Sequence, residues 1–418
     1  MTNPKAIAPG PSMKARAANA KFELDWRRSG EVGRMSDAAH PAWAVYDLDR
    51  LHANLAAIRR RCGPGRSVIA ALKGNAYGHG AAPVARALEG EGLAAFMTGS
   101  FDEARRIRSE GLRTPVVMFA GALPEGMADL VGAGLVPTVV DRAGAEAAAR
   151  AAAPGEMAPV FVKVDAGLGR LGVPLEEAET FLVDLAAMPG LEVQGLYTHL
   201  PFGDARGRDW AEQRFAAFDA LLARLEARGL APPVTQAGAS ASVAAGLSDR
   251  GNAVCVGHLL YGLSPFSETS VADLSEYRPV LAEVGSRLVQ VSNHPQGSDI
   301  AIAGSYGIRH GRRTGVAPVG AAQGLARPAP GSRPEALIRG RRVPILAVSL
   351  EHLTLDLTDV EEAEAGDAVL LLGRDKEAEI GLGELAAWFG MRELDAVLAL
   401  SGRLAAHYRG AARGATRI

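Results

Sequence analysis

Lys73 stands where its amine could act as a nucleophile. It ends an apolar run of strand length, Val68–Leu72, and a Gly-rich turn and a helical pattern from Ala82 to Leu88 follow it. Burial disfavours the charged form of a lysine, so an amine at such a strand end reacts more readily with an aldehyde. For a single lysine the alternative is a surface side chain that reaches solvent from a strand end.

The neighbours of Lys73 favour the chemical interpretation because they resemble a known family. Residues 72–80 read LKGNAYGHG, which is similar to the pyridoxal 5′-phosphate (PLP) lysine motif of the alanine racemase family; that family usually has Ala where Gly74 stands. Further blocks follow in the family's order: KVDAGLGRLG from Lys163, YTH from Tyr197 and LYGLSP from Leu260. With WAVYDL at residues 43–48, the resemblance extends to Tyr408.

The resemblance implies a PLP-dependent enzyme that acts at the Cα of an amino acid through a Schiff base on Lys73. It implies that Tyr77 and Ser240 bind the phosphate, that backbone amides of Gly257 and His258 cap it, and that Tyr261 belongs to the cofactor site. His199 would lie against the cofactor ring. Arg170 would reach the ring oxygen and the substrate carboxylate, for which a planar guanidinium is suited.

Lys163 has two interpretations. The matching family lysine is often carbamylated, which would hold Arg170 in place. The alternative is an ion pair with Asp165 at the end of the strand.

Cys255 is the first departure from the family pattern. The family has an arginine there, which donates to the pyridine nitrogen and keeps it unprotonated. A thiol is a weak donor without that fixed charge, so the ring would be protonated more readily and would stabilise a carbanion better. The alternative is a buried cysteine that behaves as a small hydrophobic residue.

Ala321 is the second departure. The resemblance places it where the family has a catalytic tyrosine, supplied across a dimer as the second base. Leu350 and Glu351 align with a family Met-Asp pair, and with Tyr306 and Ala321 they are predicted to line the substrate. Candidates for a substitute base are Tyr306, His310, Glu351 and His352. Arg392 aligns loosely with a further family tyrosine.

A methyl group cannot carry a proton, and two-base racemisation needs a base on each face of the carbanion. We therefore expect a family enzyme with an altered substrate or reaction that racemises alanine poorly. Loss of a large ring at Ala321 would also widen the pocket for a bulkier substrate. The alternatives are a PLP-dependent aldolase or transaldolase, decarboxylase or β-eliminase, for which one base and an electron sink suffice, and a non-catalytic PLP-binding homologue.

Composition limits the partners and the compartment. The chain has 418 residues and a net charge of −2, which argues against nucleic acid or an anionic membrane as a partner. It has two cysteines, and no apolar stretch approaches a membrane span, so a reducing, cytoplasmic location is expected. We predict an amino acid substrate, a homodimer with shared active sites and no metal.

The order of elements predicts an α/β fold: a (β/α)8 TIM-type barrel over residues 43–270 and a mostly β domain over 271–418, after an extension at 1–42 that we expect to be a flexible tail. Lys73, Asp165 and His199 fall at carboxyl ends of barrel strands. The segment Leu394–Arg409 is predicted to be a helical tail. The predicted barrel strands are 68–72, 94–98, 116–119, 137–140, 160–164, 193–197, 234–237 and 254–257.

Overall fold

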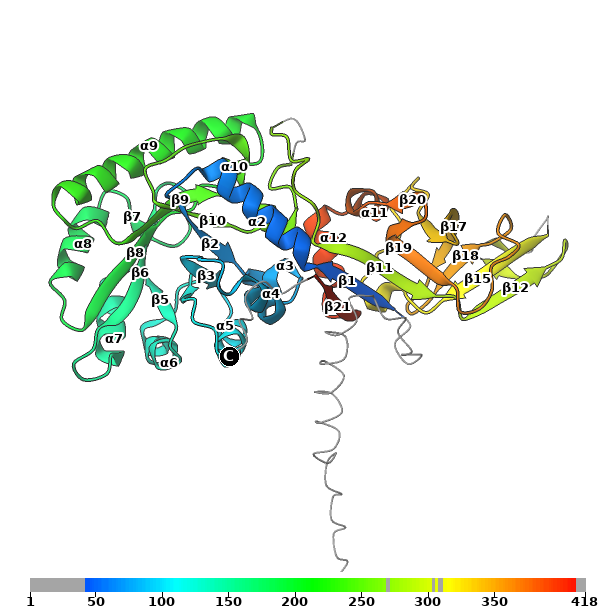
Figure 1. Ribbon diagram of the computed structural model, residues 1–418, viewed down its shortest axis with the longest axis horizontal. Helices are drawn as coiled ribbons and strands as arrows, with labels where there is room; N and C mark the ends of the chain where they lie inside the picture. Colours follow the sequence, from blue (N-terminus) through cyan, green and yellow to red (C-terminus); the bar gives the residue numbers. More distant parts are fainter. Residues whose placement is uncertain (1–41, 268–270, 303–304, 307–310, 411–418) are drawn as a thin grey trace, which may run out of the picture. The chain divides into compact units, whose positions relative to one another are not determined.

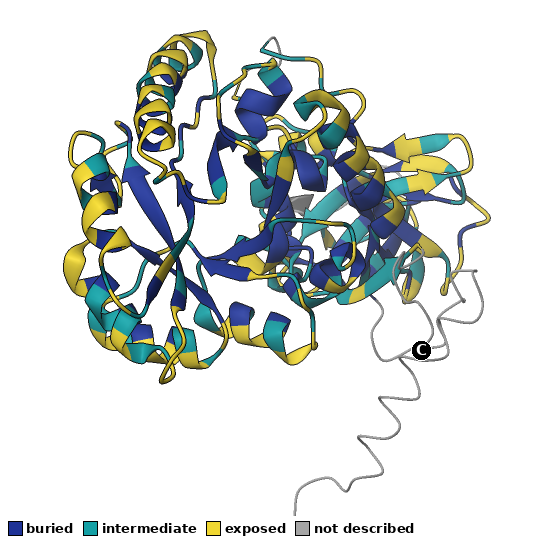
Figure 2. Cartoon of the chain, turned by 60° about the vertical axis from the view of Figure 1, so that its left-hand side comes forward, coloured by how far each residue is buried: buried dark blue, intermediate teal, exposed yellow. Residues whose placement is uncertain are grey.

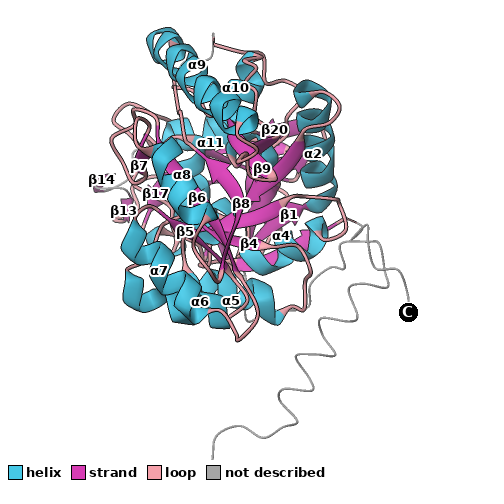
Figure 3. Cartoon of the chain, turned by 90° about the vertical axis from the view of Figure 1, so that its left-hand side faces the viewer, coloured by secondary structure: helices cyan, strands magenta, loops and turns pink. Residues whose placement is uncertain are grey.

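Eight parallel strands close into a barrel with helices around it (Figures 1 and 3). The structure is a computed structural model that describes residues 42–267, 271–302, 305–306 and 311–410. The ring closes because β10 pairs with β2 and β5 pairs with β6. The barrel strands are β2 (Ser67–Ala71), β3 (Ala95–Thr98), β4 (Val116–Met118), β5 (Val136–Val139), β6 (Ala158–Asp165), β8 (Leu191–Tyr197), β9 (Val234–Ala239) and β10 (Ala253–Val256). The predicted barrel is confirmed.

The barrel strands are continuous apolar runs because both of their faces are covered. β3, β4 and β5 are buried at every residue, and the covering helices expose only their outer faces (Figure 2). Ser100, Asp141 and Asp204 cap three of these helices by accepting a backbone N–H. The helices between barrel strands are α3 (Lys73–Tyr77), α4 (Ala81–Leu88), α5 (Phe101–Ser109), α6 (Met127–Gly132), α7 (Arg142–Ala151), α8 (Ala178–Ala186), α9 (Ala205–Ala227) and α10 (Ser240–Ala245).

A mostly antiparallel sheet follows the barrel in the sequence. Its order is β12-β15-β18-β17-β16-β19-β11-β1-β21, and β20 pairs with β19. These strands are β1 (Trp43–Asp47), β11 (Leu281–Arg287), β12 (Gln290–His294), β15 (Arg312–Ala317), β16 (Glu335–Ile338), β17 (Arg341–Val348), β18 (Leu353–Asp356), β19 (Ala368–Asp375), β20 (Ala378–Ile380) and β21 (Ala405–Arg409).

The remaining elements are short, apart from α2, which connects β1 to the first barrel strand. They are α2 (Leu48–Cys62), α11 (Leu382–Trp388), α12 (Glu393–Leu400), β7 (Val173–Pro174), the pair β13 (Ala301–Ile302) and β14 (Ser305–Tyr306), and the 3-10 turns η2 (Pro124–Gly126), η3 (His258–Tyr261) and η4 (Ala321–Gln323). Within the described residues, no helix combines the length and the hydrophobicity that crossing a bilayer requires.

Two predicted boundaries differ from the structure. β1 belongs to the second sheet, because it pairs antiparallel with β11 and parallel with β21. The barrel part of the chain therefore begins after Asp47, the last residue of β1. The predicted helical tail, Leu394–Arg409, is the helix α12 followed by the strand β21. Both differences arise from pairing between the two ends of the domain, which local patterns do not encode. The predicted extension at 1–42 lies almost entirely outside the described residues.

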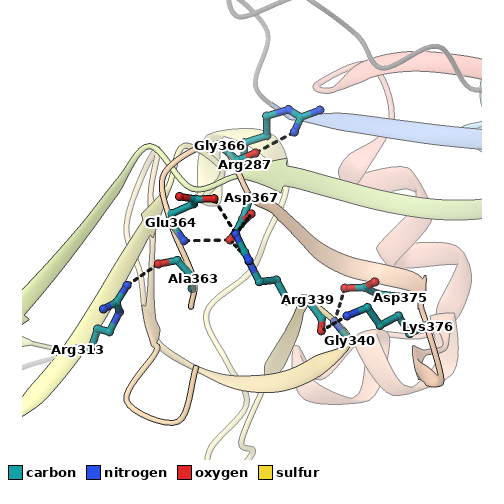
Figure 4. Close-up of polar contacts among 10 residues, drawn as sticks. All are labelled: Arg287, Arg313, Arg339, Gly340, Ala363, Glu364, Gly366, Asp367, Asp375 and Lys376. Atoms are coloured by element: carbon teal, nitrogen blue, oxygen red, sulfur yellow. Dashed lines mark hydrogen bonds and ion pairs between the residues drawn. The ribbon is translucent and has the colours of Figure 1, made fainter. Parts of the chain in front are cut away.

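Asp367 clamps two turns of the second sheet (Figure 4). Its carboxylate accepts from Arg339 Nε at 2.5 Å and Nη2 at 2.9 Å, and from the Glu364 N–H at 3.0 Å. Lys376 Nζ donates to the Arg339 carbonyl at 3.1 Å. Burial raises the pKa of Asp367, but the Arg339 hydrogen bonds and charge outweigh it and hold that pKa below its usual value.

We predict that Asp367→Asn lowers the melting temperature at neutral pH. The folded pKa is depressed, so the clamp stabilises the fold above the unfolded pKa of about 3.9 and is lost as pH falls through the folded value. The difference between the two proteins should therefore shrink in acid. The control is Glu364→Gln: the Glu364 side chain is 75% exposed and should matter little. An equal loss at pH 7 and in acid would contradict this account.

Candidate active site

Lys73 follows strand β2, whose last four residues are buried. Its Nζ lies 5.4 Å from the centroid of the Phe119 ring and 5.8 Å from that of Tyr77. Burial lowers the pKa of Lys73, Arg170 lowers it further, and Cys255 opposes them. The lowered amine pKa expected from the sequence is thus present, and its main cause is desolvation.

A left-handed turn follows the lysine. Residues 74–77 have φ between 54° and 62°, a conformation that costs L-residues about 1–2 kcal/mol each. Gly74 adopts it freely and Asn75 tolerates it, but Ala76 and Tyr77 do not. Two backbone hydrogen bonds hold the turn. The Ala76 N–H donates to the Leu72 carbonyl at 2.7 Å, and the Gly78 N–H donates to the Gly74 carbonyl at 2.8 Å. It directs Lys73 and Tyr77, four residues apart, to one site.

Glu103 braces this turn, a role that the sequence analysis missed. Its carboxylate accepts the Asn75 N–H at 2.7 Å and the Thr98 hydroxyl at 2.7 Å. Asn75 in turn accepts the Ala81 N–H at 2.9 Å through its side chain. Gly74-Asn75 was a usable signal for a left-handed turn. Nothing local connects Glu103 to it, because the contact spans 28 residues.

A cradle of neutral polar groups lies beside this turn. Ser240 Oγ accepts the Gly257 N–H at 3.1 Å and lies 3.4 Å from the Leu259 nitrogen. Gly257 has no room for a side chain, because a Cβ there would collide with the Tyr77 hydroxyl. Hydroxyl and backbone N–H groups that converge in this way bind phosphate. Four predicted residues, Tyr77, Ser240, Gly257 and His258, therefore meet at one place.

Tyr261 supports the cradle by packing against Tyr77. Its side chain is fully buried, and its hydroxyl donates to the Ala71 carbonyl at 2.9 Å. The ring stacks on Tyr77 at 5.1 Å and on His79 at 4.7 Å between centroids. With its surface covered and its hydroxyl bonded to the end of β2, Tyr261 positions Tyr77 and Lys73, and we no longer expect it to contact a cofactor itself.

Cations gather on the other side of Lys73. Lys163 is buried, and burial, with Arg170 as the next cause, lowers its pKa to about 8. Burial also lowers the pKa of His199 to about 3, helped by Lys73, Arg170 and Lys163. His199 is therefore neutral near pH 7. Such a set suits an anionic ligand with more than one negative group.

Asp165 shapes the loop that carries Arg170. Its Oδ1 accepts the N–H groups of Gly167, Leu168 and Gly169 at 2.9, 2.8 and 3.1 Å. Burial raises the pKa of Asp165, but these bonds hold it below its usual value. No ion pair joins it to Lys163 within the described residues, although the Asp165 charge acts to raise the pKa of Lys163 against burial and Arg170.

Cys255 lies on β10, two residues before the cradle. Burial raises the pKa of its thiol to about 11, with Lys73 opposing, so the thiol is protonated at neutral pH. It donates to Met97 Sδ at 3.6 Å. The position thus presents a neutral, weakly polar group between the cradle and the lysine.

The predicted substrate-lining residues cluster on the second sheet. The Ala321 N–H donates to the Ser349 carbonyl at 3.0 Å, and the Ala322 N–H donates to the Leu350 carbonyl at 2.7 Å. Ala321 and Glu351 are exposed, and Leu350 is 71% exposed. Only the backbone of Tyr306 is described, in β14, and His310 lies outside the described residues. Arg392 is exposed and pairs with Asp395 at 3.0 Å.

The fold and the site define a barrel enzyme built around a reactive lysine, and comparison gives its family. The model described as "Alanine racemase, N-terminal domain" matches residues 46–265, and "Alanine racemase, C-terminal domain" matches 281–408. This chain therefore belongs to the alanine racemase family, whose members use PLP.

Individual alanine racemases are similar to this chain over most of its length. The alanine racemase of Desulfosudis oleivorans is 30% identical over 387 residues, which is 90% of this chain and 98% of the relative. The alanine racemase of Desulforamulus reducens is 29% identical over 374 residues, which is 88% of this chain and 99% of the relative. The solved alanine racemase from Streptomyces coelicolor A3(2) is 27% identical, has a TM-score of 0.78 and covers 90% of this chain and 100% of its own.

We predict that Tyr77→Phe weakens PLP binding about 10- to 100-fold, because one hydrogen bond to a charged group contributes about 1.5–3 kcal/mol. The matched control is Tyr261→Phe, which removes the donor to the buried Ala71 carbonyl. It should lower the melting temperature and change PLP affinity far less. Equilibrium dialysis and thermal unfolding distinguish the two. Equal losses of affinity would show that Tyr261 contacts the cofactor.

Proposed function

We propose that this protein is a PLP-dependent enzyme that acts at the Cα of an amino acid from one face, with Lys73 as its base. The residues fit the cofactor: an amine of lowered pKa, a cradle that excludes a Cβ at Gly257, and Arg170, whose charge acts on the amine. When bound, PLP supplies an aldehyde for a lysine amine and a ring that withdraws electrons from Cα.

The chain's own residues would then divide the work. Tyr77, Ser240 and the Gly257 N–H hold the phosphate. Lys73, freed by the substrate amine, would take or return a proton at Cα, and its lowered pKa favours the neutral amine that this role needs. Arg170 binds the substrate carboxylate, and the neutral ring of His199 packs against the cofactor.

Ala321 is the observation that carries the one-face proposal. Its methyl group stands where the resemblance expects the second base. The neighbouring Leu350 is apolar and exposed, and Glu351 and His352 are also exposed. An exposed surface with an apolar residue is what an interface with a second copy of the chain would need. We therefore also propose a homodimer in which this surface faces the partner's Lys73. With no hydroxyl at Ala321, alanine racemisation should be slow, and a bulkier amino acid has room.

Cys255 favours the second candidate, a one-base reaction such as aldol cleavage, decarboxylation or β-elimination. A neutral thiol imposes no positive charge on the pyridine nitrogen, so that nitrogen is free to take a proton. A protonated ring withdraws electrons more strongly, which stabilises charge at Cα for longer. Those reactions need that stabilisation more than they need a second base.

The proposal as a whole is tested at Lys73. We expect the protein to bind PLP with a visible absorption band, and borohydride reduction to leave a mass adduct on the peptide that contains Lys73. Lys73→Ala should abolish both, whereas Lys163→Ala should retain the adduct. A protein that stays colourless with PLP and yields no adduct would refute the proposed function.

We predict that Ala321→Tyr increases alanine racemisation by about 100-fold or more, because a positioned acid–base group contributes 10²–10⁴. Ala321→Phe, which adds the same ring without its hydroxyl, should not. Deuterium exchange in heavy water adds a second measurement: the unaltered protein should exchange the Cα proton of one alanine enantiomer only. Rapid exchange of both enantiomers would show that another base already serves the second face.

A further inference from the structure

The phosphate cradle is electrically neutral. Ser240 Oγ, the Tyr77 hydroxyl and the Gly257 N–H carry no net charge, and burial raises the pKa of Tyr77 well above its usual value, so its hydroxyl stays protonated. A phosphate monoester carries about −1.5 to −2 charges at pH 7. Neutral donors make hydrogen bonds to such a group, but they do not neutralise its charge. The cradle therefore leaves a charge for a neighbouring side chain to balance.

His258 is that neighbour. It follows Gly257 directly and begins η3, so its backbone belongs to the cradle. Its imidazole lies edge-on against Tyr77, with ring centroids 5.2 Å apart at 74°. Tyr77 is the residue whose hydroxyl borders Gly257. The imidazole thus lies against the side chain that supplies one of the three neutral donors, and its backbone adjoins another.

We propose that the His258 side chain is a ligand of the cofactor phosphate and takes up a proton when the phosphate binds. This inference rests on the proposed use of PLP. The neutral cradle then gains one charge-assisted hydrogen bond, and PLP affinity becomes dependent on pH.

The charges around His258 support this coupling. Lys73 and Tyr77 face it from the turn after β2, His199 from the end of β8, and Arg392 from the start of α12. These groups are cationic or neutral. Burial, then Lys73 and Arg392, lowers the pKa of His258 to about 4, so the imidazole is neutral without an anion. A phosphate dianion reverses the sign of the local field and favours the imidazolium.

Arg392 does not substitute for His258. Its side chain is 81% exposed, and its guanidinium is paired with Asp395 through Nε at 3.0 Å. Lys73 is needed at the aldehyde end of the cofactor. Of the groups just named, His258 alone lies in the cradle and can acquire a charge on demand.

The test measures proton uptake on PLP binding. Isothermal titration of the apoprotein with PLP in two buffers of different ionisation enthalpy gives the number of protons taken up. We compare the unaltered protein, His258→Gln and His258→Arg. Cofactor ionisation and the reaction at Lys73 are common to all three, so they cancel in the differences.

We expect the unaltered protein to take up close to one proton more than His258→Gln at pH 7. Its affinity advantage over His258→Gln should be about tenfold or more near pH 6 and should fall as the pH rises to about 9. His258→Arg carries a fixed charge and should bind PLP tightly without the extra proton. Pyridoxal, which has no phosphate, should give the same proton count with each protein.

Equal proton uptake and equal affinity in the three proteins would overturn the inference and leave the proposed function standing, provided that the Lys73 adduct forms. An extra proton that persists with pyridoxal would also overturn it, because the phosphate would not be its cause. Should His258→Gln fail to fold by circular dichroism, His258→Arg against the unaltered protein gives the same comparison. Failure of the unaltered protein to bind PLP would overturn both proposals.

Discussion

The left-handed turn at residues 74–77 is the constraint on which the site depends. It reverses the chain after Lys73 within a single turn, so one strand end supplies both an amine and the Tyr77 hydroxyl of the phosphate cradle. A right-handed turn would send the side chains after Lys73 in other directions, because the hand of the turn sets where each Cβ points. Two contacts offset the strain of the turn. The Glu103 carboxylate accepts the Asn75 N–H, and the Tyr261 ring stacks on the Tyr77 ring. Rigidity at this point fixes the distance between the two ends of a bound cofactor.

Desolvation, more than any ion pair, sets the electrostatics of the site. It lowers the pKa values of Lys73, Lys163 and His199, and it raises that of Cys255. Each group is thereby moved toward its neutral form. The site therefore holds several groups whose charge can change, beside the guanidinium of Arg170. An anionic ligand can then determine which group is protonated, which an enzyme that moves protons at a carbon atom requires.

Much of this arrangement could be predicted from the sequence. The barrel strands were recognisable as short buried apolar runs, and the placement of Lys73, Asp165 and His199 at their ends follows from the parallel topology. The pairing of β1 with β21 could not be predicted, because it joins segments about 360 residues apart. For the same reason Glu103 was missed, and the hydrogen bond from the Tyr261 hydroxyl to the Ala71 carbonyl could not be predicted. Local pattern identifies elements and motif residues; partners distant in the sequence need the fold.

The two departures, Cys255 and Ala321, are best understood together. By the resemblance, Ala321 stands where the family has a proton carrier, and Cys255 stands where the family has a fixed positive charge. A racemase with only the first change would hold a short-lived carbanion with no donor on one face. A cofactor ring with no fixed positive charge beside its nitrogen would be free to take a proton and would withdraw electrons from Cα more strongly, which suits cleavage of another Cα bond in place of the Cα–H bond. The pair is therefore chemically consistent, and each substitution makes the other more useful for a one-base reaction.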